Sequence, residues 1–230
     1  MTLYGVELVQ ARDVEEVASV VADALVDAAH AGQAITLTGG ESPRRSYELA
    51  AEREPDWSAA SLWWGDERCV PPEDDRSNYK LARESLLDRL AVQPRAVQRI
   101  KGELGAEAAA EEYDAELREV ELGFVLLGLG PDSHVASLYP NQPTLEELDR
   151  HAIPAEAMLE PFVERVTLTV PVLCSAPEVV FIVTGEAKAE AVERAFAQPP
   201  DPATPASLVR SSGGRTRLVA DATATSRLRG

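Results

Sequence analysis

Short apolar runs alternate along this chain with longer stretches in which apolar side chains recur at a helical period. The apolar runs are too short for most helices and predict buried strands at residues 3–9, 34–38, 61–65, 124–127, 179–184 and 216–220. The helical stretches between them fall at about 14–31, 43–51, 77–90, 105–120 and 186–196. This alternation predicts an α/β fold with a mostly parallel sheet and helices on both faces.

Helix starts and loops are marked by residue type. Asp13, with Glu16 three residues later, and Ser77 are typical helix N-caps. The polar region 142–164 contains several prolines and predicts a loop with a short helix near Leu145. The other expected elements are strands at 97–101 and 165–170, a short helix from Pro171, a linker-like loop at 199–205 and a C-terminal helix capped by Asp221.

Composition and net charge indicate which kinds of binding partner and which cellular compartment to expect. The chain has 230 residues, enough for one large domain or two small ones, and a formal net charge of -17. Such an acidic protein lacks the basic surface that neutralises phosphates, so we expect no nucleic-acid partner. Cys69 and Cys174 have no metal-type spacing and favour reduced thiols in a cytoplasmic protein. We see no signal-peptide pattern and no stretch of membrane-spanning length.

Three of the predicted strands end in unusual polar turns. These are Gly39-Gly40, Asp66-Glu67-Arg68 and Asp132-Ser133-His134. Because the carboxyl ends of parallel strands meet at one edge of a sheet, we expect the three turns to lie close together. The sequence therefore predicts a functional site at that edge.

His134 is the candidate for proton transfer at this site. Of the three histidines in the chain, it alone directly follows a predicted buried strand. A histidine with a carboxylate nearby can take a proton from water near neutral pH, although a loop histidine that is hydrogen-bonded for structure remains an equal alternative. Ser133 is not surrounded by a Gly-x-Ser-x-Gly elbow, so we do not expect a serine hydrolase.

Other motifs suit the binding of an anion. Glycines before the helix start at Pro43 let the backbone approach a ligand, and Ser42 either contributes there or caps the helix. Arg68 offers a guanidinium for phosphate, or forms an ordinary surface ion pair. Asn78 could reach the same pocket, or merely cap a helix. Lys188 lies in a first helical turn, a poor place for a cation unless a ligand anion offsets the cost.

Taken together, these motifs resemble the 6-phosphogluconolactonase family over nearly the whole chain and in the same order. The matching segments are Gly-Gly-Glu-Ser-Pro at 39–43, Gly-Asp-Glu-Arg at 65–68, Val-Pro at 70–71, Ser-Asn at 77–78, Gly-Leu-Gly-Pro-Asp-Ser-His at 128–134, Ala-Ser-Leu-Tyr-Pro at 136–140, Arg-Val-Thr-Leu-Thr at 165–169 and Gly-Glu-Ala-Lys at 185–188. The related glucosamine-6-phosphate deaminases share the fold but carry Phe-Asn-Glu-Pro-like residues in place of 137–140.

The resemblance implies a single Rossmann-like domain over residues 1–230 that hydrolyses 6-phosphogluconolactone without a metal or cofactor. It implies His134 as the general base, with Asp66 orienting or tuning it. It further implies that Arg68 and Lys188 hold the phosphate of the substrate, and that either cation could instead stabilise the developing oxyanion. The other implied substrate-binding residues are Gly39, Gly40, Ser42 and Asn78. We expect a monomer or weak homodimer with no membrane partner.

Two positions depart from the family pattern. Ser133 replaces a glycine, and serine is disfavoured there if the turn needs a positive φ. Glu41 replaces a small hydroxyl residue in the predicted phosphate turn, and we expect its carboxylate to face outward. These departures leave open a sugar-phosphate sensor without catalysis. The shared fold leaves open a second alternative, a sugar-phosphate isomerase or deaminase.

Overall fold

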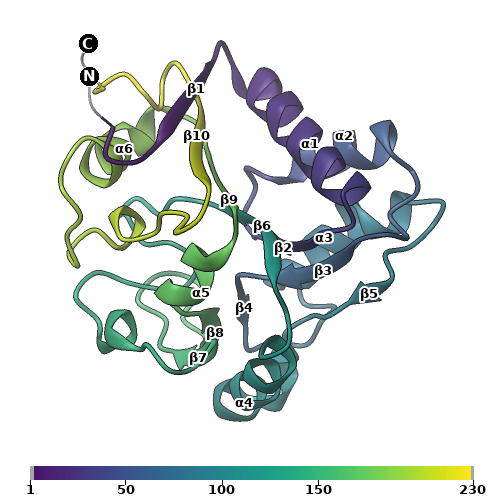
Figure 1. Ribbon diagram of the computed structural model, residues 1–230. Helices are drawn as coiled ribbons and strands as arrows, with labels where there is room; N and C mark the ends of the chain where they lie inside the picture. The colour runs from purple at the N-terminus through teal and green to yellow at the C-terminus, as the bar shows by residue number, and fades with distance from the viewer. Residues whose placement is uncertain (1–2, 229–230) are drawn as a thin grey trace.

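A parallel sheet of seven strands forms the centre of the computed structural model, which describes residues 3–228 (Figure 1). Each strand is hydrogen-bonded to its neighbours in the parallel sense. Their order across the sheet is β1 (Glu7–Ala11), β10 (Arg215–Asp221), β9 (Glu178–Val183), β6 (Leu122–Leu127), β2 (Ala34–Leu37), β3 (Ser61–Trp64) and β5 (Ala96–Val97). The predicted α/β class with a mostly parallel sheet is therefore confirmed.

The strand order reverses between β2 and β6. From β2 the chain proceeds outward to β3 and β5, whereas from β6 it proceeds in the opposite direction to β9 and β10. In open α/β sheets, ligands bind outside the carboxyl ends of the strands at such a switch point. The fold thus marks the crevice beyond β2 and β6 as the place to look for a site.

Six α-helices are present among the described residues: α1 (Val14–His30), α2 (Arg44–Arg53), α3 (Asn78–Ser85), α4 (Ala106–Leu117), α5 (Val170–Ser175) and α6 (Ala189–Phe196). Helix α1 packs against α2 and the strands β9 and β10, while α4 lies elsewhere, at the bottom of the view in Figure 1. The predicted N-cap of α1 is confirmed, because the Asp13 carboxylate accepts a hydrogen bond from the Glu16 N–H at 2.9 Å. No helix in the described part of the chain is long and apolar enough to cross a membrane.

A second, antiparallel sheet was not predicted. It has the order β4 (Asp66–Arg68), β8 (Arg165–Leu168) and β7 (Ala152–Ala155), and α4 packs against it. Our expectation that 66–68 is a turn and that 142–164 lacks a strand was wrong. A three-residue polar strand has no detectable period, and Pro154 inside β7 argues against a strand except at a sheet edge, where β7 lies.

Two terminal predictions also need correction. Strand β1 begins at Glu7 and not at residue 3, because Gly5 with φ of 68° makes a turn first. No helix follows Asp221 within the described residues, where the chain forms successive turns instead. Thr223 and Thr225 direct their hydroxyls at Asp221, which competes with regular helix formation.

Candidate active site

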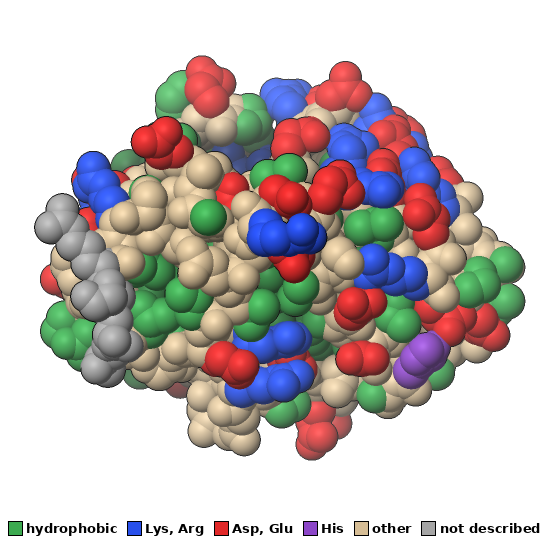
Figure 2. Space-filling view, turned by 90° about the horizontal axis from the view of Figure 1, so that it is seen from above, with side chains coloured by type: hydrophobic (Ala, Val, Ile, Leu, Met, Phe, Trp, Pro, Cys, Tyr) green, Lys and Arg blue, Asp and Glu red, His purple; other side chains and the backbone are tan. Residues whose placement is uncertain are grey.

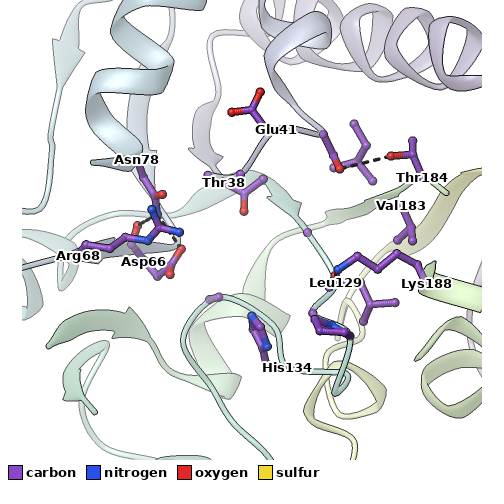
Figure 3. A pocket seen from close by; sticks show the side chains of 18 of the residues that line it. Thr38, Glu41, Asp66, Arg68, Asn78, Leu129, His134, Val183, Thr184 and Lys188 are labelled. Atoms are coloured by element: carbon purple, nitrogen blue, oxygen red, sulfur yellow. Dashed lines mark hydrogen bonds between the residues drawn. The ribbon is translucent and has the colours of Figure 1, made fainter. Parts of the chain in front are cut away.

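A pocket of about 240 Å³ lies beyond the carboxyl ends of β2, β3, β6 and β9, at the switch point of the sheet. Thr38, Gly128 and Thr184, which directly follow β2, β6 and β9, line it together with Asp66, two residues after β3. The pocket brings together all of the predicted site residues, which are Gly39, Gly40, Ser42, Asp66, Arg68, Asn78, His134 and Lys188. Figure 3 shows Arg68, Asp66 and Asn78 on one side, Thr184 and Lys188 on the other, and His134 between the two groups in the view.

His134 is paired with Asp132. The ring Nδ1 lies 2.6 Å from Asp132 Oδ1, and the same oxygen accepts the backbone N–H of His134 at 3.1 Å. The Tyr139 ring packs on the imidazole with centroids 4.8 Å apart. A Cβ on Gly130 would lie 2.0 Å from His134 Nδ1, so glycine is needed there to admit the ring. Burial alone would raise the pKa of Asp132, but the hydrogen bond and charge of His134 hold it below its ordinary value.

The carboxylate that is hydrogen-bonded to the His134 ring is thus Asp132 and not Asp66, which we expected to orient or tune the imidazole. The Asp66 carboxylate lies in the pocket wall and is hydrogen-bonded elsewhere, to Ser137 Oγ at 2.7 Å and to Asn78 Nδ2 at 3.1 Å. The Asn78 side chain also packs closely against the glycine turn, because a Cβ on Gly39 would lie 1.8 Å from Asn78 Oδ1. One asparagine thus contacts both the turn after β2 and the residue Asp66 after β3.

Glu67 lies on the face of β4 that is opposite the pocket and stabilises the wall formed by Asp66 and Arg68. Successive side chains of a strand point to opposite faces, so Glu67 points away from the pocket that Asp66 and Arg68 line. It is buried and accepts the backbone N–H groups of Arg68, Asn78 and Tyr79 at 2.7 to 2.8 Å and the Ser77 hydroxyl at 3.0 Å. Burial raises the pKa of Glu67, and these hydrogen bonds oppose the rise. Its carboxylate therefore ties β4 to the start of α3.

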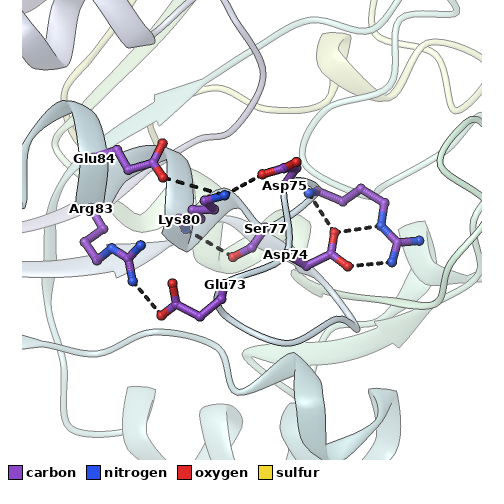
Figure 4. A network of polar contacts seen from close by, with 8 residues as sticks. Glu73, Asp74, Asp75, Ser77, Lys80, Arg83 and Glu84 are labelled. Atoms are coloured by element: carbon purple, nitrogen blue, oxygen red, sulfur yellow. Dashed lines mark hydrogen bonds and ion pairs between the residues drawn. The ribbon is translucent and has the colours of Figure 1, made fainter.

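The loop before α3 is held by a network of ion pairs (Figure 4). Arg83 lies 2.6 Å from Glu73, and Arg76 lies 2.7 Å from Asp74, while Lys80 pairs with Asp75. The predicted cap is also confirmed, since Ser77 Oγ accepts the Lys80 N–H at 3.1 Å. Asn78, the first residue of α3, lines the pocket.

We expect Glu67→Gln to lower the free energy of unfolding by about 2 kcal/mol, because the new amide N–H₂ would face donors that need an acceptor. Urea unfolding followed by circular dichroism measures this change. Glu119→Gln, at an exposed position, is the control and should have little effect. Equal stability of the two variants would mean that the Glu67 carboxylate is not needed to hold β4 to α3.

The opposite side of the pocket carries several hydrogen-bond donors. Gly40 has a φ of 85°, and Ser42 Oγ lies 3.4 Å from Thr184 Oγ1. Lys188 reaches in from the start of α6 and donates from Nζ to the Leu129 carbonyl at 2.7 Å. Burial lowers the pKa of Lys188, and the charge of Asp132 opposes that decrease. Backbone, hydroxyl and ammonium groups in this arrangement suit an oxyanion.

Cations in the pocket differ from those on the surface. Among the residues that the structure describes, every lysine and arginine has a carboxylate within 4.0 Å except Arg68, Arg95, Arg165, Lys188 and Arg210. Arg68, Arg165 and Lys188 all line the pocket. On the face in Figure 2, by contrast, basic side chains lie among acidic ones. Arg165 was not among the residues predicted for the site, although it begins one of the family motifs. Within residues 3–228, no group of three His, Cys, Asp or Glu side chains is arranged to hold a metal ion.

The two departures from the family pattern have clear positions. Glu41 lies at the rim with its side chain 86% exposed and 3.3 Å from Arg44, as expected for a carboxylate that faces outward. Ser133 has a φ of 71° and is fully buried, so it occupies the strained conformation that was anticipated. Its hydroxyl has no hydrogen-bond partner. The serine therefore carries two costs that a glycine would not.

We expect Ser133→Gly to raise the free energy of unfolding by about 1 kcal/mol, because it removes backbone strain and a buried unpaired hydroxyl while adding chain entropy to the unfolded state. Catalytic activity should stay equal or increase. Urea unfolding and steady-state kinetics of the purified variant measure both quantities. A large loss of activity in the folded variant would show that the Ser133 hydroxyl has a role of its own.

The fold and the pocket define a class of protein: an α/β protein with an Asp–His pair and an anion-binding pocket at the switch point of its sheet. Comparisons with known proteins place it within that class. The model of the family described as glucosamine-6-phosphate isomerases/6-phosphogluconolactonase matches residues 9–218. The chain belongs to this family.

Individual relatives agree with the family match. The probable 6-phosphogluconolactonase 1 of Arabidopsis thaliana is 36% identical over 86% of this chain and 82% of its own length. The 6-phosphogluconolactonase of Streptomyces coelicolor is 33% identical over 96% of this chain and 94% of its own length. The structure of the Trypanosoma brucei 6-phosphogluconolactonase superposes with a TM-score of 0.88, covering 99% of this chain and 100% of that chain. At 24% identity, this last similarity shows the fold alone.

Proposed function

We propose that this protein hydrolyses 6-phospho-D-glucono-1,5-lactone to 6-phosphogluconate, the lactonase step of the pentose phosphate pathway. The observation that carries the proposal is the Asp132–His134 pair, which lies in a pocket lined by three cations without carboxylate partners. The names of the relatives, which are 6-phosphogluconolactonases, support the same substrate.

His134 acts as the general base. Its hydrogen bond to Asp132 keeps a proton on Nδ1 and leaves Nε2 free to accept one. Nε2 removes a proton from water as the water oxygen adds to C1 of the lactone. The C1–ring oxygen bond then breaks as the ring oxygen takes the proton from Nε2, which restores the neutral imidazole. The carboxylic acid formed at C1 loses its remaining water-derived proton to solvent and becomes the carboxylate of the product. The lowered pKa of Asp132 keeps that carboxylate charged beside the imidazolium that forms.

The phosphate group of the substrate binds on the side of Lys188. The Lys188 ammonium supplies charge, and the backbone N–H groups and the Ser42 hydroxyl of the glycine turn supply directed hydrogen bonds. No carboxylate of the described residues makes an ion pair with Lys188, so its charge is available for a ligand. The Asp66 and Asn78 side chains lie on the opposite wall. They contact the hydroxyl groups of the sugar ring directly, or they position other pocket residues that do so.

Acid release after addition of fresh lactone, corrected for spontaneous hydrolysis, tests the proposal. We expect hydrolysis by the protein and little by His134→Ala. Ammonia release from glucosamine 6-phosphate would instead assign a deaminase on the same fold. Binding of sugar phosphates without any hydrolysis above background would assign a non-catalytic sensor.

We further propose that the protein works in the cytoplasm as a monomer or weak homodimer. Both cysteines are unpaired within the described residues, which agrees with a reducing compartment. Sedimentation velocity over a range of protein concentrations tests the oligomeric state, and a concentration-independent dimer would contradict it.

A further inference from the structure

Arg165 and Arg68 lie directly opposite one another in the small sheet. Strands β4 and β8 pair antiparallel, with Arg68 against Arg165 and Asp66 against Thr167. Side chains at directly opposite positions share a face and lie about 4.5–5.5 Å apart at Cβ. Both arginines line the pocket, so the sheet places two neighbouring arginine side chains at its wall.

Neither arginine of this pair forms an ion pair in the described part of the chain. Neither arginine has a carboxylate within 4.0 Å, and the Nε atom of each is buried without a hydrogen-bond partner. Arg165 is 4% exposed, and its Nη2 donates to the backbone carbonyls of Leu159 and Pro161 at 3.3 and 3.1 Å. Like charges at opposite positions of an antiparallel pair destabilise it, and a buried unpaired donor adds to that cost. An oxyanion bound between the two guanidinium groups would relieve both costs.

We propose that Arg165 is a second substrate-binding residue, which acts with Arg68 on the C1 oxygen of the lactone and not on the phosphate. This assignment rests on the lactonase function proposed above. The pair binds the lactone carbonyl, holds the oxyanion as water adds, and then holds the carboxylate of the product. Arg165 thereby separates the pocket into an arginine side for C1 and a lysine side for the phosphate.

The position of Asp66 favours C1 over the phosphate at the arginine side. Asp66 lies two residues from Arg68 on the same face of β4, so its carboxylate shares the wall with the arginine pair. A phosphate dianion bound there would be repelled by that carboxylate at close range. A lactone carbonyl is neutral when it binds and gains charge only in the transition state. The wall that carries Asp66 therefore suits C1 better, and Lys188 lies on the other side of the pocket (Figure 3).

The arginine pair should stabilise the transition state more strongly than it stabilises the substrate complex. Hydrogen bonds to a developing oxyanion strengthen as its charge grows, so the pair lowers the barrier more than it tightens substrate binding. Lysine at position 165 would keep the charge but lose the planar fork of donors. Its effect should therefore appear mainly in kcat, with the KM for the phosphorylated lactone almost unchanged.

The kinetic test compares Arg165→Lys with wild type on the phosphorylated lactone and on plain gluconolactone. We expect kcat/KM to decrease by roughly tenfold to a hundredfold, by the same factor for both substrates. Arg210→Lys is the matched control, because Arg210 also lacks a carboxylate partner and donates to backbone carbonyls but lies outside the pocket lining. A loss confined to the phosphorylated substrate, or one no larger than in Arg210→Lys, would overturn the proposal.

A binding test does not depend on turnover. Calorimetry measures the affinity of wild type and Arg165→Lys for 6-phosphogluconate and for glucitol 6-phosphate, which has no carboxylate. We expect about a tenfold or greater loss for 6-phosphogluconate alone. Equal losses for the two ligands would place the phosphate at the arginine pair and reject our assignment. If wild type binds both ligands equally but hydrolyses no lactone, the arginine assignment and the proposed function both fail. Preferential binding of 6-phosphogluconate without hydrolysis would reject the lactonase function alone.

Arg165 is buried, so its replacement could prevent folding. Arg68→Lys is then the second variant for the same kinetic test. Arg68 is only partly buried, and in our proposal it contacts the same ligand atom. The same equal loss on both lactones is expected. A selective loss on the phosphorylated lactone would again place the pair at the phosphate.

Discussion

His134→Ala is expected to lower kcat/KM for the phosphorylated lactone by about a hundredfold or more, which is the usual contribution of a general base. The imidazole is held by Asp132 on one nitrogen and packed against Tyr139, and neither His30 nor His151 lines the pocket. Binding of 6-phosphogluconate should survive, because the proposed phosphate and C1 contacts come from other residues. Stopped-flow or pH-stat assays of lactone hydrolysis, with calorimetry for binding, measure the two effects separately.

His30→Ala provides the matched control for this change. His30 is an exposed histidine that also pairs with a carboxylate, Glu54, but it lies outside the pocket lining. Its replacement should leave hydrolysis unchanged. Wild-type turnover in folded His134→Ala would assign the proton transfer to another group and remove the main support for the proposed mechanism.

Lys188→Ala is expected to lower kcat/KM for the phosphorylated lactone by roughly tenfold to a few hundredfold, since a charge-assisted hydrogen bond contributes about 1.5–3 kcal/mol. The slow hydrolysis of plain gluconolactone should hardly change, because that substrate has no phosphate for Lys188 to bind. Parallel assays of the two lactones give the ratio directly. The result separates phosphate recognition from catalysis at C1.

Lys101→Ala is the control for Lys188. Lys101 pairs with Glu112 outside the pocket lining, so its loss should affect neither substrate. Equal losses on the two lactones in Lys188→Ala would place the ammonium at the carbonyl. If kcat/KM decreased for neither lactone, Lys188 would be a structural residue whose role is the hydrogen bond to the Leu129 carbonyl.

The main sheet could be predicted from the sequence because its strands are continuous apolar runs. Such runs are buried in a sheet that has helices on both faces. The sequence also placed the pocket, since parallel strands bring their carboxyl ends to one edge. It could not show which of Asp66 and Asp132 contacts His134. Both carboxylates follow a strand, and only the geometry of the turn brings Asp132 to the imidazole ring. Arg165 was missed for a related reason. Its pairing with Arg68 depends on the register of two strands far apart in the chain, one of them only three residues long.

The pairing of surface cations with carboxylates has a consequence for how substrate arrives. With a net charge of -17 and its surface arginines neutralised locally, the protein presents an outer field that repels a sugar phosphate dianion. Only the last few ångströms, within the Debye length of the pocket cations, are attractive. A substrate dianion must therefore cross a low electrostatic barrier before it binds. Added salt screens this repulsion and should increase the rate of substrate association.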